Sequence, residues 1–404
     1  MSARTSLGIA AGLGAVLAGG SWVWQHQAEI VTRRPFNEWT FTHMNRVLPT
    51  EPVHCAEQPT QLVSAPDDRL IAGVTYDYQG RHTIADLHRR THTTAFLVLH
   101  RGRVLHESYP GRFASPRTRF QVFSVTKSVT SMLVGIALER GEIGSTGDQI
   151  VDYLPELRGS SYNGVTIEQL LTMSSGVGGI EDWTIPDSVI NRFSAAVTTG
   201  GSVLDVVRST ERAHQPGTAF NYSTIDTHVL GWVLEAATGS SLARYAERHL
   251  WRPMGAETDA YYFLTRGRPR TALGGGSLNA TIRDLARVGA IMAHGGRVGE
   301  TQLVPAAWVE RSRGSTLPYL QVGALLAGGG YPHYGYANQW WTLGGERRAI
   351  TGLGVHGQFL WVDPRSETVI VKTTAWNTAD DEEKDRETCT ALAAIVLAVE
   401  AAAS

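Results

Sequence analysis

Ser124 and Lys127 combine residue types and a spacing that could perform nucleophilic chemistry. They open the apolar run from Ser124 to Arg140, whose spacing predicts a helix that stops at Gly141. Residues three apart share a helix face, so the serine hydroxyl and the lysine amine can meet there. A buried lysine loses solvation, which lowers its pKa and lets it accept a proton from the serine. The alternative interpretation is that Ser124 only caps the helix.

The use of lysine at this position favours the catalytic interpretation. Lys127, Lys372 and Lys384 are the only lysines among 36 basic residues, and arginine supplies the rest. An arginine does not lose its proton in proteins, so it could not serve as the base. A chain that uses arginine almost everywhere else therefore has a lysine where a base is needed.

Tyr222 is a candidate for a second proton-transfer group. It lies in the turn-rich stretch 214–223, just before a predicted helix at Thr227–Ala237. Tyr222 forms a set of motifs with Ser124, Lys127 and the segments 172–176 (TMSSG) and 275–281 (GGSLNAT). The sequence resembles the penicillin-binding-protein and class C β-lactamase superfamily, and within it the 6-aminohexanoate-dimer hydrolase and carboxylesterase branch. The resemblance covers roughly residues 90–400.

The resemblance implies a mixed α/β (α+β) fold of the β-lactamase and transpeptidase type. We expect an antiparallel sheet flanked by N- and C-terminal helices, with an inserted all-helical lobe. The catalytic domain would span residues 31–404. Its α/β lobe would comprise about 60–125 and 270–404, and its helical lobe about 126–269. The active site would lie in the cleft between the two lobes.

The resemblance also implies catalytic roles. Ser124 would attack an amide or ester and form an acyl-enzyme, with Lys127 taking the serine proton. Tyr222 would relay that proton to the leaving group. The oxyanion would be held by the backbone N–H groups of Ser124 and Val355.

Two departures from the family pattern concern substrate recognition. The segment 352–354 (GLG) stands where β-lactam-processing members have K-T-G, so the cation that receives a substrate carboxylate is missing. The segment 372–374 (KTT) lacks the glycine of that motif, and we interpret it as an ordinary strand. Thr224 stands where the Y-x-N motif has asparagine. These changes argue against β-lactams and peptidoglycan stem peptides as substrates.

Three residues are candidates for lining the substrate cleft. Asp182 and Trp183 lie in a loop that borders the cleft by resemblance, and packing is the alternative role for Trp183. His356 follows the 352–354 segment and could partly replace the missing cation; a packed or solvated histidine is the alternative.

Other segments predict the elements that must position these residues. Two extended runs, at 95–99 and 103–109, flank a glycine-bearing turn and predict a β-hairpin. Strands are expected at 359–362 and 368–373, and helices at 166–173, 281–294 and 387–400. Residues 25 to about 90 show no sharp periodicity and predict an irregular lead-in with a helix or two.

Length and composition exclude several classes of protein. A chain of 404 residues with 42% hydrophobic residues is folded and favours two lobes. A formal net charge of -2 gives no basic field for a nucleic-acid partner. His88 and His92 are four apart, but no third ligand is evident, so we expect neither a metal nor another cofactor.

The N-terminus predicts export. Residues 7–24 form an uncharged run of 18 residues, a length near the lower limit for a membrane span. A cleaved signal peptide, an uncleaved anchor and a core helix are the alternatives for residues 1–30. Trp22 and Trp24 suit a membrane interface and favour the anchor. The body would then face the periplasm or cell exterior, or be secreted if the segment is cleaved.

The two cysteines, Cys55 and Cys389, are a possible disulfide. In the superfamily that the chain resembles, the two chain ends pack together against one face of the sheet, and an exported body would meet an oxidising compartment. Two unrelated buried thiols are the alternative.

Two classes of function fit these observations. The first is a serine hydrolase acting on a small-molecule amide or ester, with a D,D-peptidase or β-lactamase as the runner-up. The second is a catalytically silent, membrane-tethered binding protein on the same fold. A binding protein does not need Ser124, Lys127 and Tyr222 together, so the hydrolase is favoured. The oligomeric state remains open.

Overall fold

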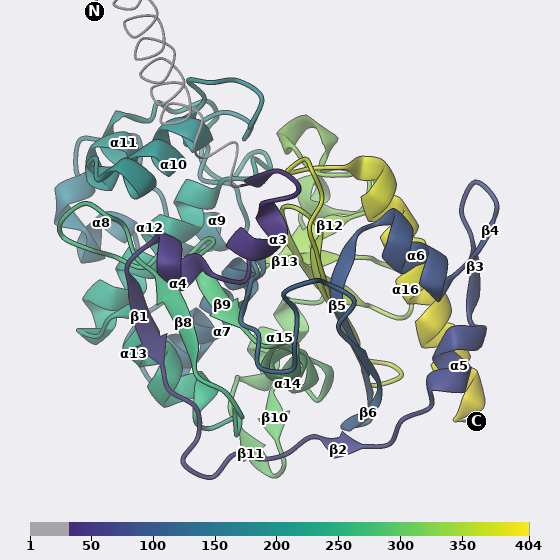
Figure 1. Cartoon of the computed structure of the whole chain (residues 1–404). Helices are drawn as coiled ribbons and strands as arrows, with labels where there is room; N and C mark the ends of the chain where they lie inside the picture. The colour runs from purple at the N-terminus through teal and green to yellow at the C-terminus, as the bar shows by residue number, and fades with distance from the viewer. Residues whose placement is uncertain (1–31, 404) are drawn as a thin grey trace, which may run out of the picture.

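The computed structural model describes residues 32–403, which form a large sheet with helices on both faces and, beside it, a mainly helical region (Figure 1). The sheet is antiparallel except for the parallel β2–β6 pair. The two halves of the chain meet at β5 and β16, where Val98 lies opposite Ile370. The strands, in spatial order, are β12 (Gly335–Ala337), β13 (Trp340–Thr342), β14 (Ile350–Gly354), β15 (Gln358–Asp363), β16 (Thr368–Thr374), β5 (Thr93–His100), β6 (Arg103–Ser108) and β2 (Val63–Ser64). The predicted α/β fold is confirmed.

Strand β5 shows how the sheet is buried. Phe96 and Val98 belong to one hydrophobic core, Leu97 and Leu99 to the other, and all four are buried. Helix α16 (Glu382–Ala402) contributes to the first core and α14 (Ile282–Ala293) to the second. Because both faces of the strand are covered, its sequence is continuously apolar and does not alternate.

The predicted hairpin is present as β5 and β6, joined by Arg101 and Gly102. Both turn residues have positive φ, 46° and 73°. This two-residue geometry matches the right-handed twist of the strands, and glycine adopts it without strain.

A run of helices separates β7 (Phe120–Gln121) from β8 (Ala260–Phe263). Its members are α7 (Val125–Glu139), α8 (Ile150–Tyr153), η1 (Pro155–Leu157), α9 (Ile167–Leu171), α10 (Val189–Thr199), α11 (Val203–Ser209), α12 (Thr224–Thr238), α13 (Leu242–Ala246) and the π-helix η2 (Glu247–Trp251). The helical region thus ends at Trp251, before the expected bound near residue 269, because β8 leaves it to pair with a strand from the lead-in.

The lead-in is more regular than the sequence predicted. Its strand β1 (Thr50–Val53) joins β8, β9 (Leu278–Ala280) and β7 in a four-stranded sheet of order β1-β8-β9-β7. Its other elements are α3 (Asn37–Thr40), α4 (Met44–Val47), α5 (Asp68–Gly73), the hairpin β3 (Thr75–Asp77) and β4 (Arg81–Thr83), and α6 (Ile84–Arg90). The remaining elements, after α14, are β10 (Arg297–Val298), β11 (Thr301–Gln302), α15 (Ala306–Arg311), η3 (Pro318–Leu320) and η4 (Leu326–Gly328).

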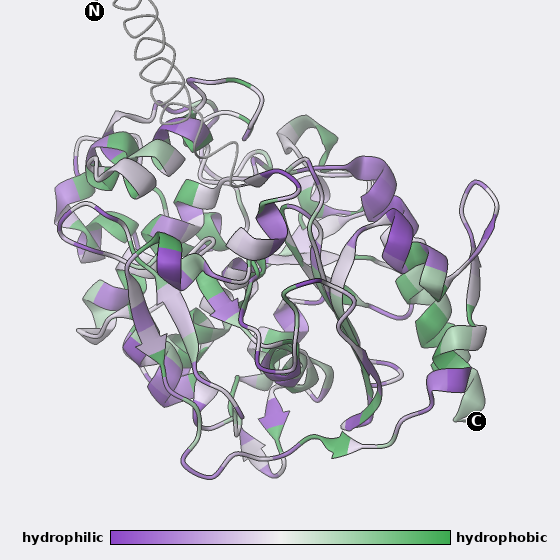
Figure 2. Ribbon diagram, in the orientation of Figure 1, coloured by the Kyte–Doolittle hydropathy of each residue, from purple (hydrophilic) through white to green (hydrophobic). Residues whose placement is uncertain are grey.

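The C-terminal helix begins at Glu382, five residues before the predicted start at Glu387. The Asp381 carboxylate caps it by accepting the backbone N–H of Lys384 at 3.1 Å. Figure 2 shows that the helix is hydrophilic at its start and hydrophobic further along. The apolar periodicity that predicted this helix therefore locates only its packed part.

Lys372 lies in β16, as the interpretation of 372–374 as an ordinary strand requires. Its side chain shares a face with Ile370 and lies under α16, where Nζ is 3.5 Å from Thr388 Oγ1. The ammonium position is 5.5 Å from the ring centre of Phe359 and 5.9 Å from that of Trp376. Burial lowers the pKa of Lys372 to about 7.

Lys372→Met is expected to stabilise the fold, most strongly at low pH. Below about pH 7 the folded state must hold a buried charge, whereas the unfolded chain holds the same charge in water up to about pH 10.5. The gain in unfolding free energy should be about 2 kcal/mol at pH 6 and should fall as the pH rises towards 10. Urea unfolding at pH 6 and pH 9.5 measures it, with the partly exposed Lys384→Met as the control. An equal gain at both pH values would contradict the burial argument.

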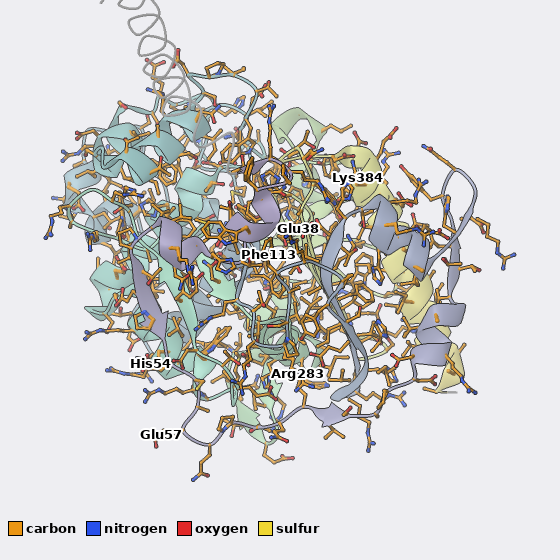
Figure 3. All side chains as sticks on the ribbon, viewed as in Figure 1. Glu38, His54, Glu57, Phe113, Arg283 and Lys384 are labelled. Carbon is orange, nitrogen blue, oxygen red and sulfur yellow. The ribbon has the colours of Figure 1, made fainter. Side chains whose placement is uncertain are left out.

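The prediction of a possible disulfide between Cys55 and Cys389 is wrong, because both cysteines are free thiols. Cys55 follows β1, and its backbone N–H donates to Asp259 Oδ1 at 2.8 Å. Cys389 lies in α16 on the other side of the sheet, 2.8 Å from the Tyr334 hydroxyl. Figure 3 places the neighbouring residues His54 and Lys384 on different sides of the molecule. Strand β1, which Cys55 follows, pairs with β8, whereas the later part of the lead-in, from α5 to α6, packs on α16. The part of the lead-in that meets α16 is therefore not the part that carries Cys55.

Among residues 32–403, no helix has the length and apolar character needed to cross a membrane. The predicted anchor or signal segment, residues 7–24, lies outside the described residues. It therefore stays a prediction.

Candidate active site

Ser124 stands at the N-terminal end of α7, as the spacing predicted. The residue before it, Phe123, has a φ of 46°, an uncommon value for a non-glycine residue. The Phe123 ring packs edge-on against Phe41, with ring centres 4.8 Å apart, and at a tilt against His356, with ring centres 5.4 Å apart. This aromatic contact holds the turn that presents Ser124 at the helix start.

Lys127 is buried and touches Ser124. Its Nζ lies 2.7 Å from Ser124 Oγ, 2.9 Å from Thr224 Oγ1 and 2.9 Å from the carbonyl oxygen of Gly275. Burial lowers the pKa of Lys127 to about 8, against the opposing effect of the Glu181 carboxylate, which raises it. A substantial fraction of the side chain is therefore neutral near pH 8 and able to accept a proton.

Tyr222 completes the group, because its ring lies beside the amine. Lys127 Nζ is 4.9 Å from the ring centre, and the Tyr222 backbone N–H donates to the Gly328 carbonyl at 3.0 Å. Burial and the nearby Glu181 raise the pKa of Tyr222 well above its ordinary value, while a hydrogen bond with Ser124 lowers it. The phenol thus stays protonated at neutral pH and can pass on a proton that it receives.

Glu181 and Thr224 complete the surroundings of Lys127, and sequence reasoning missed this role for both. The Thr224 hydroxyl donates to Glu181 Oε2 at 3.0 Å, and the Thr224 backbone N–H donates to Glu181 Oε1. Burial raises the pKa of Glu181, while Lys127 and the two Thr224 donors act in the opposite direction. Thr224 was noticed only as a replacement for asparagine, and an acidic residue beside Asp182 and Trp183 was the available signal for Glu181.

Strand β14 and the residue that follows it, Val355, form the pocket wall beside Ser124. Leu353, Gly354 and Val355 line the same pocket as Ser124. A Cβ on Gly354 would lie 2.4 Å from the carbonyl oxygen of Val122, so only glycine lets the strand pass this close to the turn before α7. The backbone of β14 is thereby held beside the serine, where an oxyanion hole would be needed.

The pocket around Ser124 is aromatic and acidic. None of its described lining residues is lysine or arginine. Its aromatic lining consists of Trp183, Tyr222, Tyr331, Trp341, Phe359 and Trp376. Its carboxylates belong to Glu181, Asp380 and Asp385. Burial and the neighbouring Asp385 raise the pKa of Asp380 to about 6.

The structure brings only one of the three cleft candidates into this pocket. Trp183 lines it. The Asp182 carboxylate instead accepts the backbone N–H and hydroxyl of Thr184, at 2.8 and 2.6 Å. His356 is buried between Phe41 and Phe123, and its Nδ1 contacts the Trp376 carbonyl at 2.9 Å. Burial lowers the pKa of His356 to about 4, so it does not supply the missing cation.

One cluster of metal-ligand types adjoins the pocket. Donor atoms of His333, Asp385 and Cys389 lie within 4.8 Å of one another. These atoms already satisfy each other: His333 Nε2 contacts Asp385 Oδ2 at 2.7 Å, and the Tyr334 hydroxyl contacts both Asp385 and Cys389. The buried amine of Lys372 also lies close enough to influence Asp385. We therefore interpret the cluster as a hydrogen-bond network beneath the pocket wall.

The comparisons with known proteins agree with this geometry. The beta-lactamase family profile matches residues 73–395. A 6-aminohexanoate-dimer hydrolase from Paenarthrobacter ureafaciens is 34% identical over 357 residues, 86% of this chain and 87% of that protein. The structure of a candidate 6-aminohexanoate-dimer hydrolase from Bacillus anthracis has a TM-score of 0.81 at 24% identity, covering 92% of this chain and 96% of that one. A family VIII carboxylesterase has a TM-score of 0.57 at 17% identity, covering 77% and 96%. The resemblance inferred from the motifs is confirmed, and the chain belongs to the beta-lactamase family and is a hydrolase.

Proposed function

We propose that this protein is a serine hydrolase that cleaves linear amides or esters through an acyl-enzyme on Ser124. The observation that carries the proposal is the 2.7 Å contact between Ser124 Oγ and Lys127 Nζ at the foot of the pocket. A nucleophile and a base within hydrogen-bond reach are the minimum that such a mechanism requires.

The reaction follows from the positions of these groups. Ser124 Oγ attacks the substrate carbonyl carbon while its proton moves to Lys127 Nζ. The tetrahedral oxyanion is held by the backbone N–H groups of Ser124 and Val355. The proton passes through the Tyr222 hydroxyl to the leaving amine or alcohol, which departs as the carbonyl re-forms. Water then attacks the carbonyl carbon of the acyl-enzyme ester, and Tyr222 and Lys127 transfer the proton in the reverse direction, from the water to Ser124 Oγ. The acid product leaves, and the Ser124 hydroxyl is restored.

The charges in the pocket favour a cationic or neutral substrate over an anionic one. The lining carries Glu181, Asp380 and Asp385, with no lysine or arginine among its described residues. A substrate ammonium group would pair with Asp380, whereas a substrate carboxylate would meet like charge. The aromatic walls suit an apolar chain between the reacting bond and that ammonium group. Linear amides and esters of amino acids combine these features.

Esters and linear amides are expected to be hydrolysed in preference to benzylpenicillin or a cephalosporin. A β-lactam presents a carboxylate, and Gly352 has replaced the lysine that would receive it. The ratio of kcat/KM for a short p-nitrophenyl ester over benzylpenicillin should exceed about 100. Steady-state rates on a panel of esters, linear amides and β-lactams measure it. A penicillin kcat/KM equal to that of the esters would support a β-lactamase or D,D-peptidase instead.

Asp380→Asn is expected to reduce kcat/KM about tenfold for a substrate with a free amino group, because it removes a charge-assisted contact. The N-acetylated analogue should be unaffected. Since the pKa of Asp380 is about 6, the wild-type preference for the amine should grow as the pH rises through 6. The ratio of the two substrates on one enzyme cancels the titration of Lys127. A ratio that does not change with pH, or an equal loss on both substrates, would argue against amine recognition by Asp380.

A further inference from the structure

The amine of Lys127 has three hydrogen-bond partners in the described part of the chain, and their chemical types determine where its lone pair can point. Nζ lies 2.9 Å from the Gly275 carbonyl, 2.9 Å from Thr224 Oγ1 and 2.7 Å from Ser124 Oγ. A carbonyl oxygen can only accept a hydrogen bond, so one N–H bond of the amine must point at Gly275. The two hydroxyl groups can each donate or accept, and they leave the direction of the lone pair undetermined.

Glu181 removes this ambiguity at Thr224. The Thr224 hydroxyl carries one hydrogen, and it donates that hydrogen to Glu181 Oε2 at 3.0 Å. The same carboxylate accepts the Thr224 backbone N–H through Oε1, which fixes its position. The Thr224 oxygen can then only accept a hydrogen bond from Lys127.

We propose that Glu181 is a positioning residue which, through Thr224, directs the lone pair of Lys127 at the Ser124 hydroxyl. A neutral amine has two N–H bonds and one lone pair. With Gly275 and Thr224 both restricted to accepting, the two N–H bonds are used and the lone pair is left for Ser124. This inference rests on the proposed hydrolase function and adds to it a residue that does not itself contact the reacting atoms.

The same arrangement accommodates the proton transfer. When the Ser124 proton moves to Nζ, the Ser124 oxygen keeps the bonding electron pair and forms the new bond to the substrate carbonyl carbon. The resulting ammonium group has three N–H bonds for three acceptors, and the Glu181 carboxylate balances its new charge through Thr224. Without Glu181, the Thr224 hydroxyl could rotate and donate to the lone pair, which would leave Ser124 without a base.

Fluorophosphonate labelling tests the proposal without knowledge of the substrate. The probe reacts with an activated serine, so its second-order rate constant, measured from pH 5 to pH 10, reports the supply of neutral, correctly oriented Lys127. Glu181→Gln should slow labelling about tenfold. It should also move the rising limb of the pH profile to lower pH, because the carboxylate raises the pKa of Lys127. Thr224→Val should slow labelling by a similar factor, and Thr224→Ser should label within about twofold of wild type.

The double variant separates positioning from a structural effect. If both residues act through one hydrogen-bond chain, adding Glu181→Gln to Thr224→Val should lower the labelling rate constant only slightly further. Full additivity, or wild-type rates with an unshifted limb in Glu181→Gln and Thr224→Val, would overturn the proposal. Near-ultraviolet circular dichroism shows which variants fold. If Glu181→Gln does not fold, the comparison of Thr224→Val with Thr224→Ser still tests the proposal.

Ser124→Ala in the same assay distinguishes this inference from the proposed function. Absence of labelling in Ser124→Ala, with the wild-type adduct mapped to Ser124 by mass spectrometry, supports the nucleophile. If Ser124→Ala still reacts, the proposed function fails. If Ser124→Ala does not react while Glu181→Gln and Thr224→Val both label as wild type, the function stands and the positioning role of Glu181 falls.

Discussion

Ser124→Ala is expected to abolish turnover of a short-chain p-nitrophenyl ester, lowering kcat by at least about a thousandfold. Ser124 Oγ lies 2.7 Å from the amine of Lys127 and lines the pocket, whereas the Thr224 hydroxyl, 2.9 Å from the same amine, donates its hydrogen to Glu181. The fold should be unchanged, since the removed hydroxyl makes no side-chain capping bond to α7. Initial rates over a range of ester concentrations measure the loss, and thermal unfolding checks the fold.

A matched control is available one helical turn away. Ser128 lies on the same helix, and its hydroxyl donates to the Gln339 carbonyl at 2.8 Å, away from the amine of Lys127. Ser128→Ala should therefore keep most of the activity while costing a modest amount of stability. A folded Ser124→Ala protein that keeps more than a few per cent of wild-type activity would show that the nucleophile lies elsewhere.

Lys127→Arg is expected to be nearly as damaging as Lys127→Ala, with kcat/KM reduced by about a thousandfold in both. Arginine keeps the positive charge but does not release its proton, so the comparison separates proton transfer from electrostatic stabilisation.

The pH profile provides a second reading of the same role. In the wild-type enzyme, kcat/KM should rise as the pH passes through about 8, because Lys127 must be neutral to accept the serine proton. The residual activity of Lys127→Arg should lack this rising limb. Near-normal activity in the arginine variant, with the limb retained, would remove Lys127 from the role of base.

No lysine or arginine lines this pocket among residues 32–403, which distinguishes it from a site built for carboxylate recognition. Gly352 lies in β14, where a Cβ would approach Ser128 Oγ at 3.1 Å and Val125 Cγ1 at 3.2 Å. The strand therefore packs closely on α7, and a side chain at this position would require the Ser128 and Val125 side chains to shift by a few tenths of an ångström. His356, the sequence-based substitute, is held instead by the Trp376 carbonyl and by two aromatic rings.

The sequence by itself determined the parts of this protein that depend on local patterns. The helix beginning at Ser124, the hairpin around Arg101 and Gly102 and the two strands before α16 follow from periodicity and turn residues within short windows. The contact between Ser124 and Lys127 is local too, since both lie on one helix face within a single turn. Such features need no knowledge of the rest of the chain.

Tertiary structure alone decided which distant residues surround that pair. Thr224, at the start of α12, and Gly275, in the loop before β9, contact the amine of Lys127, and Glu181 acts on it through Thr224. Asp380 reaches the pocket from the segment before α16. The sequence leaves open either a Cys55–Cys389 disulfide or two unrelated thiols, and the structure decides for free thiols because β1 carries Cys55 to β8. Contacts between segments far apart in sequence depend on which strands pair and which helix faces pack together. This arrangement minimises the free energy of the whole core rather than that of any one segment.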